Sequence, residues 1–331
     1  MKLSGFDYYL PKELIAQYPL EERDAARLLV LDRRVGTITH RIFREITDYF
    51  RKDDLLMLND SKVLPSRIIG SRKTGGKVEF LLLRQKPGPG LTFEALIRPG
   101  RVKLNERVIF NGGKIYAEVT DKNEVNFSVK DAQEIYGLGV MPLPPYIKRD
   151  SEDLDNVYYQ TVYASENGSI ASPTAGLHFT EKLLAQIKSR GVNVAHITLH
   201  ISYSTFKPVK SEDITGHKME KEFFRINKET QESIEEVRLK KGRIFAVGTT
   251  ACRSMETYAS GDTEGYTDLF IYPGYEFKMT DCLITNFHLP RTTLFMLVCA
   301  FAGEELVKKA YHEAIDLKYR FYSYGDAMLI L

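Results

Sequence analysis

The chain has 331 residues, of which 43% are hydrophobic and 27% charged, a balance typical of a globular protein with room for two domains. No apolar run follows the first two residues, and the most apolar segment, 294–303, has about half the length of a membrane-spanning helix. The three cysteines are scattered and form no Cys-x-x-Cys pair. We therefore expect a cytoplasmic protein with no membrane attachment, no disulfide framework and no structural zinc site.

Residues 1–60 carry short helix and strand patterns, including a predicted hairpin at 27–43 with Gly36 in its turn. Between residues 61 and 145, five strand-like runs follow one another, separated by Gly, Pro and Asn clusters and by no helix. Several of these runs alternate apolar with polar residues, which predicts a small antiparallel barrel or sandwich. The stiff proline segment MPLPPYI leads out of this region.

From residue 156 onward the pattern repeats strand, loop and helix, with Thr180 expected as one N-cap and either Thr292 or Thr293 as another. The first sixty residues are too few to bury a core of their own. We therefore expect an α/β main domain, barrel-like or with a mixed sheet, formed by residues 1–60 and 148–331. A small all-β barrel domain, residues 61–147, is inserted into it.

The predicted β domain carries most of the excess positive charge. Between residues 61 and 107 there are eleven basic and three acidic residues, a net charge of +8, against −6 for the rest of the chain. Such a local excess is typical of a protein that binds a polyanion such as nucleic acid. A solvated strand face rich in lysine and arginine is the alternative interpretation.

Three loops of the α/β region follow predicted strands and hold unusual polar side chains. They span 172–178, 248–253 and 286–291, and they contain His178, Arg253, Asn286 and His288. Ligands of α/β sheets bind at the carboxyl ends of the strands, where such loops lead into helices. We therefore expect the three loops to form an active site at one edge of the sheet.

Each of these residues also has a purely structural interpretation. A histidine between Leu and Phe, as at His178, is often packed against a backbone carbonyl, and His288 could be packed in the same way. Thr249 and Thr250 could cap a helix, and Arg253 could pair with Glu256 one helical turn away.

Two further groups of residues could belong either to the hydrophobic core or to the active site. His196 and His200 lie four residues apart on one predicted strand, but no third metal ligand is nearby, so they are core or site-lining residues. The C-terminal segment YRFYSYGDAMLIL surrounds Arg320 and Asp326 with aromatic residues. Such a cluster is either core or a wall for a cationic or flat ligand.

Several enzyme classes lack support. The chain has no G-x-G-x-x-G after a strand and no Walker A sequence, so neither a dinucleotide-binding fold nor a P-loop is predicted. The absence of a G-x-S-x-G elbow makes a serine hydrolase improbable.

Longer motifs identify a family. From residue 6 to residue 329 the chain closely resembles the S-adenosylmethionine:tRNA ribosyltransferase-isomerase family of queuosine biosynthesis. The motifs that carry the resemblance occur in the order FDYYLPKELIAQYP, LNDSKVLPSRI, MPLPPYI, SPTAGLHFT, VGTTACRSME, TNFHLPRTTLFMLVCAFAG and YRFYSYGDAML. The chain departs from the family pattern at Ser202 and Ser204, where glycine is expected, at Glu220, where histidine is expected, and at Lys62, where arginine is usual.

The resemblance implies that the ribosyl group of S-adenosylmethionine is transferred and isomerised. The acceptor is 7-aminomethyl-7-deazaguanine in the anticodon of tRNA, and the products are epoxyqueuosine-tRNA, adenine and methionine. S-adenosylmethionine is then a consumed substrate, and neither a metal nor another cofactor is implied. Without a heptad pattern or an obvious exposed apolar stripe, we expect a monomer.

The implied chemistry assigns roles to the residues singled out above. His178 would be the general base, with His288 as the alternative or as the acid toward adenine. Asp326 and Tyr324 would contact the cation or the acceptor amine, and Arg253 and Thr250 the methionine carboxylate. The further expected substrate contacts are Thr174, Gly176, Thr249, Asn286, Arg320, Asp7 and Asp60. The expected tRNA contacts are Arg67, Arg72, Lys73 and Arg101.

Two other functions compete with this hypothesis. An RNA methyltransferase would use the same cosubstrate but release S-adenosylhomocysteine. A non-catalytic RNA-binding protein would use the basic β domain and leave the three polar loops unexplained. A transglycosylase acting on the same base is disfavoured because its cysteine-rich zinc site is absent.

Overall fold

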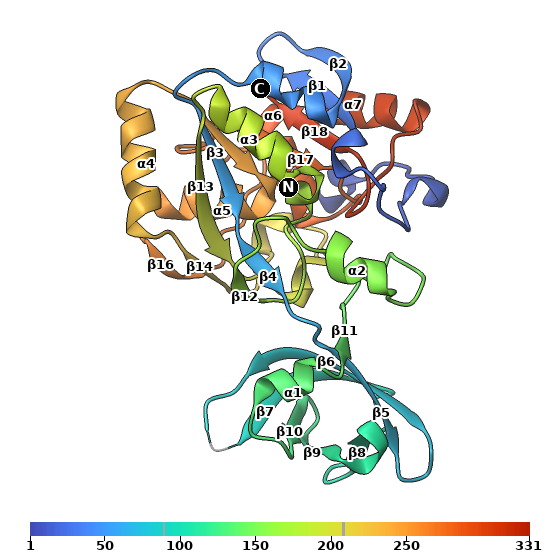
Figure 1. Cartoon of the computed structure of the whole chain (residues 1–331). Helices are drawn as coiled ribbons and strands as arrows, with labels where there is room; N and C mark the ends of the chain where they lie inside the picture. The colour runs from blue at the N-terminus through green and yellow to red at the C-terminus, as the bar shows by residue number, and fades with distance from the viewer. Residues whose placement is uncertain (89, 207–208) are drawn as a thin grey trace. The chain divides into compact units, whose positions relative to one another are not determined.

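The computed structural model describes residues 1–88, 90–206 and 209–331, and the chain divides into two compact units (Figure 1). Unit 1 contains Met1–Lys62, Pro145–Arg149 and Tyr158–Leu331, and unit 2 contains Val63–Pro144 and Asp150–Val157. Residues 150–157, which the sequence places with the α/β domain, thus group with unit 2. The predicted fold class, a mixed-sheet α/β domain with an inserted small barrel, is confirmed.

A nine-stranded mixed sheet forms the centre of unit 1, in the order β16-β14-β13-β3-β15-β17-β18-β1-β2. The β13–β3–β15–β17 pairs and the β1–β18 pair are parallel, and the other neighbours are antiparallel. The strand bounds are β1 Arg27–Asp32, β2 Thr37–Ile42, β3 Leu55–Asn59, β13 Asn193–Leu199, β14 Glu222–Arg225, β15 Ile244–Val247, β16 Glu264–Thr267, β17 Cys282–Asn286 and β18 Ala327–Ile330.

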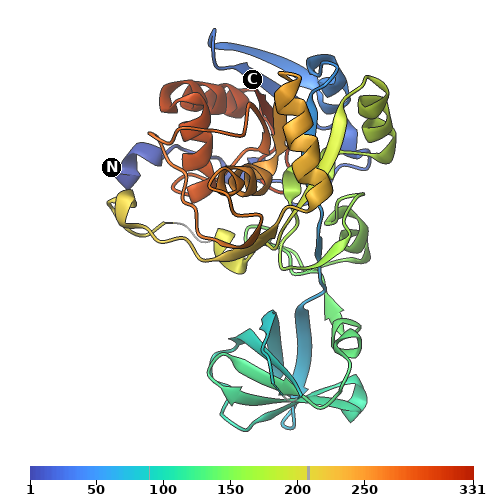
Figure 2. The ribbon, with the colours of Figure 1, turned by 90° about the vertical axis from the view of Figure 1, so that its left-hand side faces the viewer.

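Helices cover both faces of this sheet (Figure 2). Alternate residues of β3 point to opposite faces, so Leu55 and Met57 pack in one core and Leu56 and Leu58 in the other. All residues of β3, β15, β17 and β18 are buried, as expected for strands that are covered on both faces. The helix bounds are α3 Glu181–Ser189, α4 Lys228–Leu239, α5 Gly248–Tyr258, α6 Thr293–Ala302 and α7 Glu304–Asp316.

The predicted helix caps are partly correct. Thr180 accepts a hydrogen bond from the Leu183 amide at 3.1 Å, and Thr292 accepts one from the Phe295 amide at 3.3 Å. Thr249 and Thr250 do not cap α5, because they lie inside its first turn and the N-cap residue is Val247. The capping interpretation of these two threonines was therefore wrong, and the first turn of α5 has no side-chain cap.

Short elements complete the chain. β4 (Ser61–Val63) pairs with β12 (Glu166–Ser169). The 3₁₀ turns are η1 Leu3–Phe6, η2 Lys12–Leu14, η3 Arg23–Ala25, η4 Phe43–Tyr49, η5 Asn111–Gly113, η6 Thr174–His178, η7 Tyr203–Phe206 and η8 Ile214–Gly216, and the short helices are α1 Ala132–Tyr136 and α2 Asp153–Tyr158. Within the described ranges, every helix is too short or too polar to span a lipid bilayer.

Unit 2 is a closed antiparallel barrel rather than a sandwich. Its strands follow the order β11-β5-β6-β7-β10-β9-β8, and the β5–β8 pairing closes the ring. Closure brings the two strands so near at Gly70 that an added Cβ atom would lie 2.5 Å from Phe110 and 2.9 Å from the Ile109 carbonyl oxygen, so only glycine fits. The strand bounds are β5 Arg67–Arg72, β6 Lys77–Gln85, β7 Leu91–Arg98, β8 Arg107–Phe110, β9 Ile115–Asp121, β10 Glu124–Phe127 and β11 Gly139–Val140.

Candidate active site

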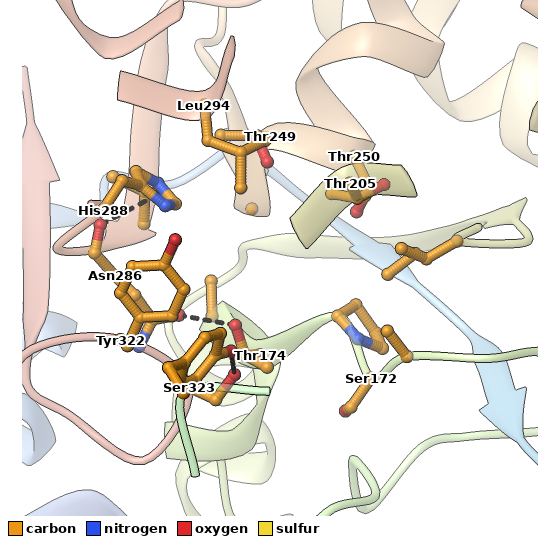
Figure 3. A pocket seen from close by; sticks show the side chains of 17 residues that line it. Ser172, Thr174, Thr205, Thr249, Thr250, Asn286, His288, Leu294, Tyr322 and Ser323 are labelled. Atoms are coloured by element: carbon orange, nitrogen blue, oxygen red, sulfur yellow. Dashed lines mark hydrogen bonds between the residues drawn. The ribbon is translucent and has the colours of Figure 1, made fainter. Parts of the chain in front are cut away.

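The three polar loops predicted from the sequence meet at one pocket of unit 1 (Figure 3). Its empty volume, with the open mouth included, is about 520 Å³, a size suited to a nucleoside ligand. Five of the predicted site residues line it, namely Thr174, Thr249, Thr250, Asn286 and His288. Among the described residues, the 17 that line it include no Asp, Glu, Lys or Arg, so we call it the uncharged pocket.

Asn286, the last residue of β17, connects two of the loops. Its Oδ1 accepts a hydrogen bond from the Thr174 hydroxyl at 3.0 Å, and its Nδ2 lies 3.1 Å from Nε2 of His178. Because the amide nitrogen can only donate, the His178 Nε2 atom is the acceptor of this bond. All three side chains are therefore fixed relative to the end of β17.

His178 does not line the uncharged pocket. Its ring packs 4.9 Å from that of Phe43 and borders a second, smaller cavity, which we call the small pocket. The imidazole is only 4% exposed, and burial lowers its pKa to about 4. His178 is therefore both packed and neutral at pH 7, with one ring nitrogen occupied by Asn286.

His288 is the histidine that lines the uncharged pocket. Its Nε2 lies 2.7 Å from the Thr285 hydroxyl, its backbone amide donates to the Tyr311 hydroxyl at 3.1 Å, and its carbonyl accepts from the Tyr8 hydroxyl. Burial lowers the pKa of His288 to about 3. At neutral pH this imidazole is uncharged and able to accept a proton.

The N-terminus of α5 also faces the uncharged pocket. Gly248, Thr249 and Thr250 all line it, and Gly248 has a φ of 88°, which glycine adopts without strain. The Thr250 hydroxyl accepts a hydrogen bond from Nδ2 of Asn59 at 3.2 Å. Free amide groups and the positive end of the helix dipole make this turn attractive to an anionic group.

Arg253, expected beside the ligand carboxylate, is not among the residues that line the pocket. Its Nη1 instead lies 2.5 Å from Glu222, which also accepts hydrogen bonds from the Ser202 amide and the Thr205 hydroxyl. Because Thr205 lines the pocket, the Arg253–Glu222 ion pair supports one of the pocket walls. The alternative pairing with Glu256 is wrong, because that carboxylate accepts the backbone amides of residues 278–280.

The C-terminal cluster separates into two roles. The buried Asp326 carboxylate accepts hydrogen bonds from the backbone amides of Arg27 at 2.9 Å and Arg320 at 2.7 Å, and it pairs with the Arg27 guanidinium. The Arg320 guanidinium donates to the Tyr18 carbonyl. Neither Asp326 nor Arg320 lines either pocket, whereas Tyr324 lines the small one.

Three other predicted contacts lie away from both pockets. Gly176 is packed against Tyr163, whose hydroxyl oxygen would lie 2.0 Å from an added Cβ atom. Asp7 pairs with Arg291. Asp60 accepts a hydrogen bond from the Thr198 hydroxyl at 2.8 Å, and burial raises its pKa.

His196, in β13, and His200, directly after this strand, each lie against an aromatic ring. His196 lies 5.9 Å from the Tyr163 ring, and His200 stacks 5.6 Å from Phe223. Among the described residues, no group of three or more His, Cys, Asp and Glu side chains is arranged to hold a metal ion.

Sequence reasoning missed several lining residues. Ser172 and Tyr322 were inside quoted motifs but carried no separate signal, and Thr205 had none. Tyr146, from the proline segment, also lines the uncharged pocket, and its hydroxyl lies 2.5 Å from that of Ser323. A contact across 177 residues could not be inferred from local pattern.

The predicted tRNA contacts on the barrel fall into two pairs. Arg67 and Arg72 are half-buried and form ion pairs with Glu79 at 2.8 Å and Glu106 at 3.4 Å. Lys73 and Arg101 are exposed, and neither has an ion-pair partner in the described parts of the chain.

The fold and the site together define an α/β enzyme with two adjacent pockets and an inserted basic barrel. The profile of the family described as "Queuosine biosynthesis protein" matches residues 3–330, and the chain belongs to this family. It is 53% identical to the S-adenosylmethionine:tRNA ribosyltransferase-isomerase of Sulfurihydrogenibium and 50% identical to that of Caldanaerobacter subterraneus, with all of each chain covered. The crystal structure of S-adenosylmethionine tRNA ribosyltransferase from Thermotoga maritima is 39% identical, with a TM-score of 0.58 over 99% of this chain and 100% of that one.

The two buried histidines should make the fold sensitive to acid. Their pKa values are lowered to about 4 and about 3, so between pH 7 and pH 5 the unfolded chain takes up protons that the folded chain does not. We expect each histidine to lower the free energy of unfolding by about 2 kcal/mol over this range. Urea denaturation of wild type and of His178→Gln and His288→Gln at both pH values measures this effect.

The exposed His312 offers the control for the substitution itself, since His312→Gln should change the free energy of unfolding at pH 7 by less than about 0.5 kcal/mol. The account of the buried histidines is contradicted if the two buried-site variants lose as much stability between pH 7 and pH 5 as wild type does.

Proposed function

We propose that this chain is an S-adenosylmethionine:tRNA ribosyltransferase-isomerase that acts on 7-aminomethyl-7-deazaguanine in the tRNA anticodon. The observation that carries the proposal is the uncharged pocket, which places the N-terminus of α5 and the neutral His288 around one nucleoside-sized space. Family membership and the names of the full-length relatives support it. The products are epoxyqueuosine-tRNA, adenine and methionine.

The uncharged pocket would bind S-adenosylmethionine. The methionine carboxylate would lie at the first turn of α5, where the amides of Gly248, Thr249 and Thr250 lack a side-chain cap. Arg253 would act only indirectly, through Glu222 and Thr205. The sulfonium would then lie among neutral polar side chains, where no fixed cation repels it.

His288 would be the general base. The reaction begins with removal of a proton from the ribose carbon beside the sulfonium, and the resulting ylide opens the ring with loss of adenine. His288 lines the pocket and is neutral, so it can take this proton and return it to the departing adenine. His178 is the weaker choice, because its ring borders the small pocket and not the uncharged one.

The barrel would hold tRNA through one of its ends. In the strand register, Arg72 of β5 lies opposite Val108 of β8, and Glu79 of β6 lies opposite Arg98 of β7. The turn between β5 and β6 and the connection between β7 and β8 therefore lie at the same end of the barrel. These turns carry the exposed Lys73, Arg101 and Lys103, which have no ion-pair partner within the described ranges. Unneutralised basic side chains on adjacent turns suit contacts with phosphates.

Localisation, cofactor use and oligomeric state complete the proposal. A tRNA substrate would be met in the cytoplasm, and three buried cysteines without disulfides fit a reducing compartment. S-adenosylmethionine is consumed, with no other cofactor, and the chain acts as a monomer.

The decisive experiment is incubation with S-adenosylmethionine and tRNA bearing the deazaguanine, followed by chromatography for adenine. We expect adenine release that depends on this tRNA, and we expect His288→Ala to slow it by about 10² to 10⁴-fold. Removal of the exposed His312 as His312→Ala should change the rate less than twofold.

Two outcomes count against the proposal. Formation of S-adenosylhomocysteine in place of adenine would indicate a methyltransferase. Turnover of His288→Ala within tenfold of wild type would remove His288 as the base.

The barrel contacts are tested by the salt dependence of tRNA binding. The double variant Lys73→Ala/Arg101→Ala should reduce the slope of log K against log salt by between about 1 and 2, because two phosphate contacts are lost. Lys114→Ala/Lys130→Ala removes two exposed charges outside these turns and should leave the slope unchanged. Equal slopes for wild type and the first variant would exclude Lys73 and Arg101 as phosphate contacts.

A further inference from the structure

The small pocket lies beside the uncharged pocket, and Ser323 lines both. Its empty volume is about 290 Å³, enough for a single base but well below that of its neighbour. Arg23, Tyr158, His178 and Tyr324 line it as well. None of these four side chains lines the uncharged pocket.

Four of the ten residues that line the small pocket have flat side chains, namely Arg23, Tyr158, His178 and Tyr324. The guanidinium carbon of Arg23 lies 5.2 Å from the centre of the Tyr158 ring, and the Tyr324 ring stands edge-on to Tyr159. Aromatic rings and guanidinium planes are the surfaces on which proteins stack unpaired bases of nucleic acids. The lining is thus suited to a planar heterocycle.

Charge distinguishes the two pockets. No described residue that lines the uncharged pocket is charged, whereas the small pocket contains Arg23. Pro19 and Leu20 also line the small pocket, and the ring of the preceding residue, Tyr18, lies 4.2 Å from the Arg149 guanidinium, although Arg149 itself is not a lining residue. A substrate that carries phosphates would be attracted to the small pocket rather than to its neighbour.

A chain of hydrogen bonds crosses the wall between the pockets. Thr174 and Asn286 line the uncharged pocket, and Asn286 contacts His178, which lines the small one. Molecules bound in the two pockets would therefore be separated by about one layer of side chains, formed by Ser323 and this chain.

We propose that the small pocket binds the acceptor base, a 7-deazaguanine turned out of the tRNA anticodon, with its aminomethyl group toward Ser323 and His178. The inference rests on the proposed function. The adenine of S-adenosylmethionine stays in the uncharged pocket with the rest of the cosubstrate. The two heterocycles then occupy separate sites that adjoin at Ser323. The aminomethyl group would extend past Ser323 to the ribosyl group, where its nitrogen bonds to a ribosyl carbon and gives up a proton, while adenine and methionine leave as in the proposed reaction.

The test uses Tyr158→Ala, with Tyr266→Ala as control because that ring is 63% exposed on β16. Binding of free 7-aminomethyl-7-deazaguanine and of S-adenosylmethionine is measured by calorimetry, and KM for the modified tRNA by adenine release. Loss of one stacking ring should weaken binding of the base, and raise KM for tRNA, by about 10 to 100-fold. The Kd for S-adenosylmethionine should change less than threefold. Arg23→Gln, which removes the other flat group, should act in the same direction.

The outcomes separate this inference from the proposed function. If wild type releases adenine and Tyr158→Ala and Arg23→Gln bind the base and tRNA as wild type does, the inference is overturned and the function stands. It is overturned equally if the variants lose affinity for S-adenosylmethionine or adenine but not for the deazaguanine. If wild type releases no adenine with this tRNA, the proposed function fails, and the assignment of the acceptor fails with it.

Discussion

The amide of Asn286 is the contact on which the arrangement of the site depends. It accepts a hydrogen bond from Thr174 and donates one to His178, so the end of a central buried strand fixes both ends of η6. His178 and Asn286 are buried and Thr174 is half-buried, so breaking either bond would leave a buried polar atom without its partner. The same bridge lies between the two pockets, so one local interaction sets both their shapes and their separation.

Burial accounts for the electrostatic character of the site. His178 and His288 lie in different pockets, yet desolvation keeps both imidazoles neutral at physiological pH. The acidic group expected near the ligand, Asp326, is instead held by two backbone amides and Arg27. A neutral surface in the larger pocket and arginine in the smaller one give the two cavities different ligand preferences.

The local sequence pattern was sufficient to predict that one unit is α/β and the other all-β. It also predicted that three polar loops lie together at one site. The buried strands β15 and β17 are nearly continuous in apolar residues, and each is followed by polar residues that line the uncharged pocket. The sequence did not reveal that β18 lies between β17 and β1, antiparallel to the first and parallel to the second, because strand order depends on packing over the whole chain. It also did not give the partner of Arg253. Glu256 is near Arg253 in the sequence, but its carboxylate accepts hydrogen bonds from backbone amides of the loop before β17. The ion-pair partner of Arg253 is instead Glu222, on β14 of the sheet.

The central claim is that the chain transfers a ribosyl unit, and not a methyl group, to a base of tRNA. Mass spectrometry of nucleosides from tRNA treated with the protein and with S-adenosylmethionine labelled in the ribose tests it most directly. The claim predicts that the deazaguanine nucleoside gains the label together with the mass of one isomerised ribosyl unit. A gain of one methyl mass, or an unchanged nucleoside, would contradict it.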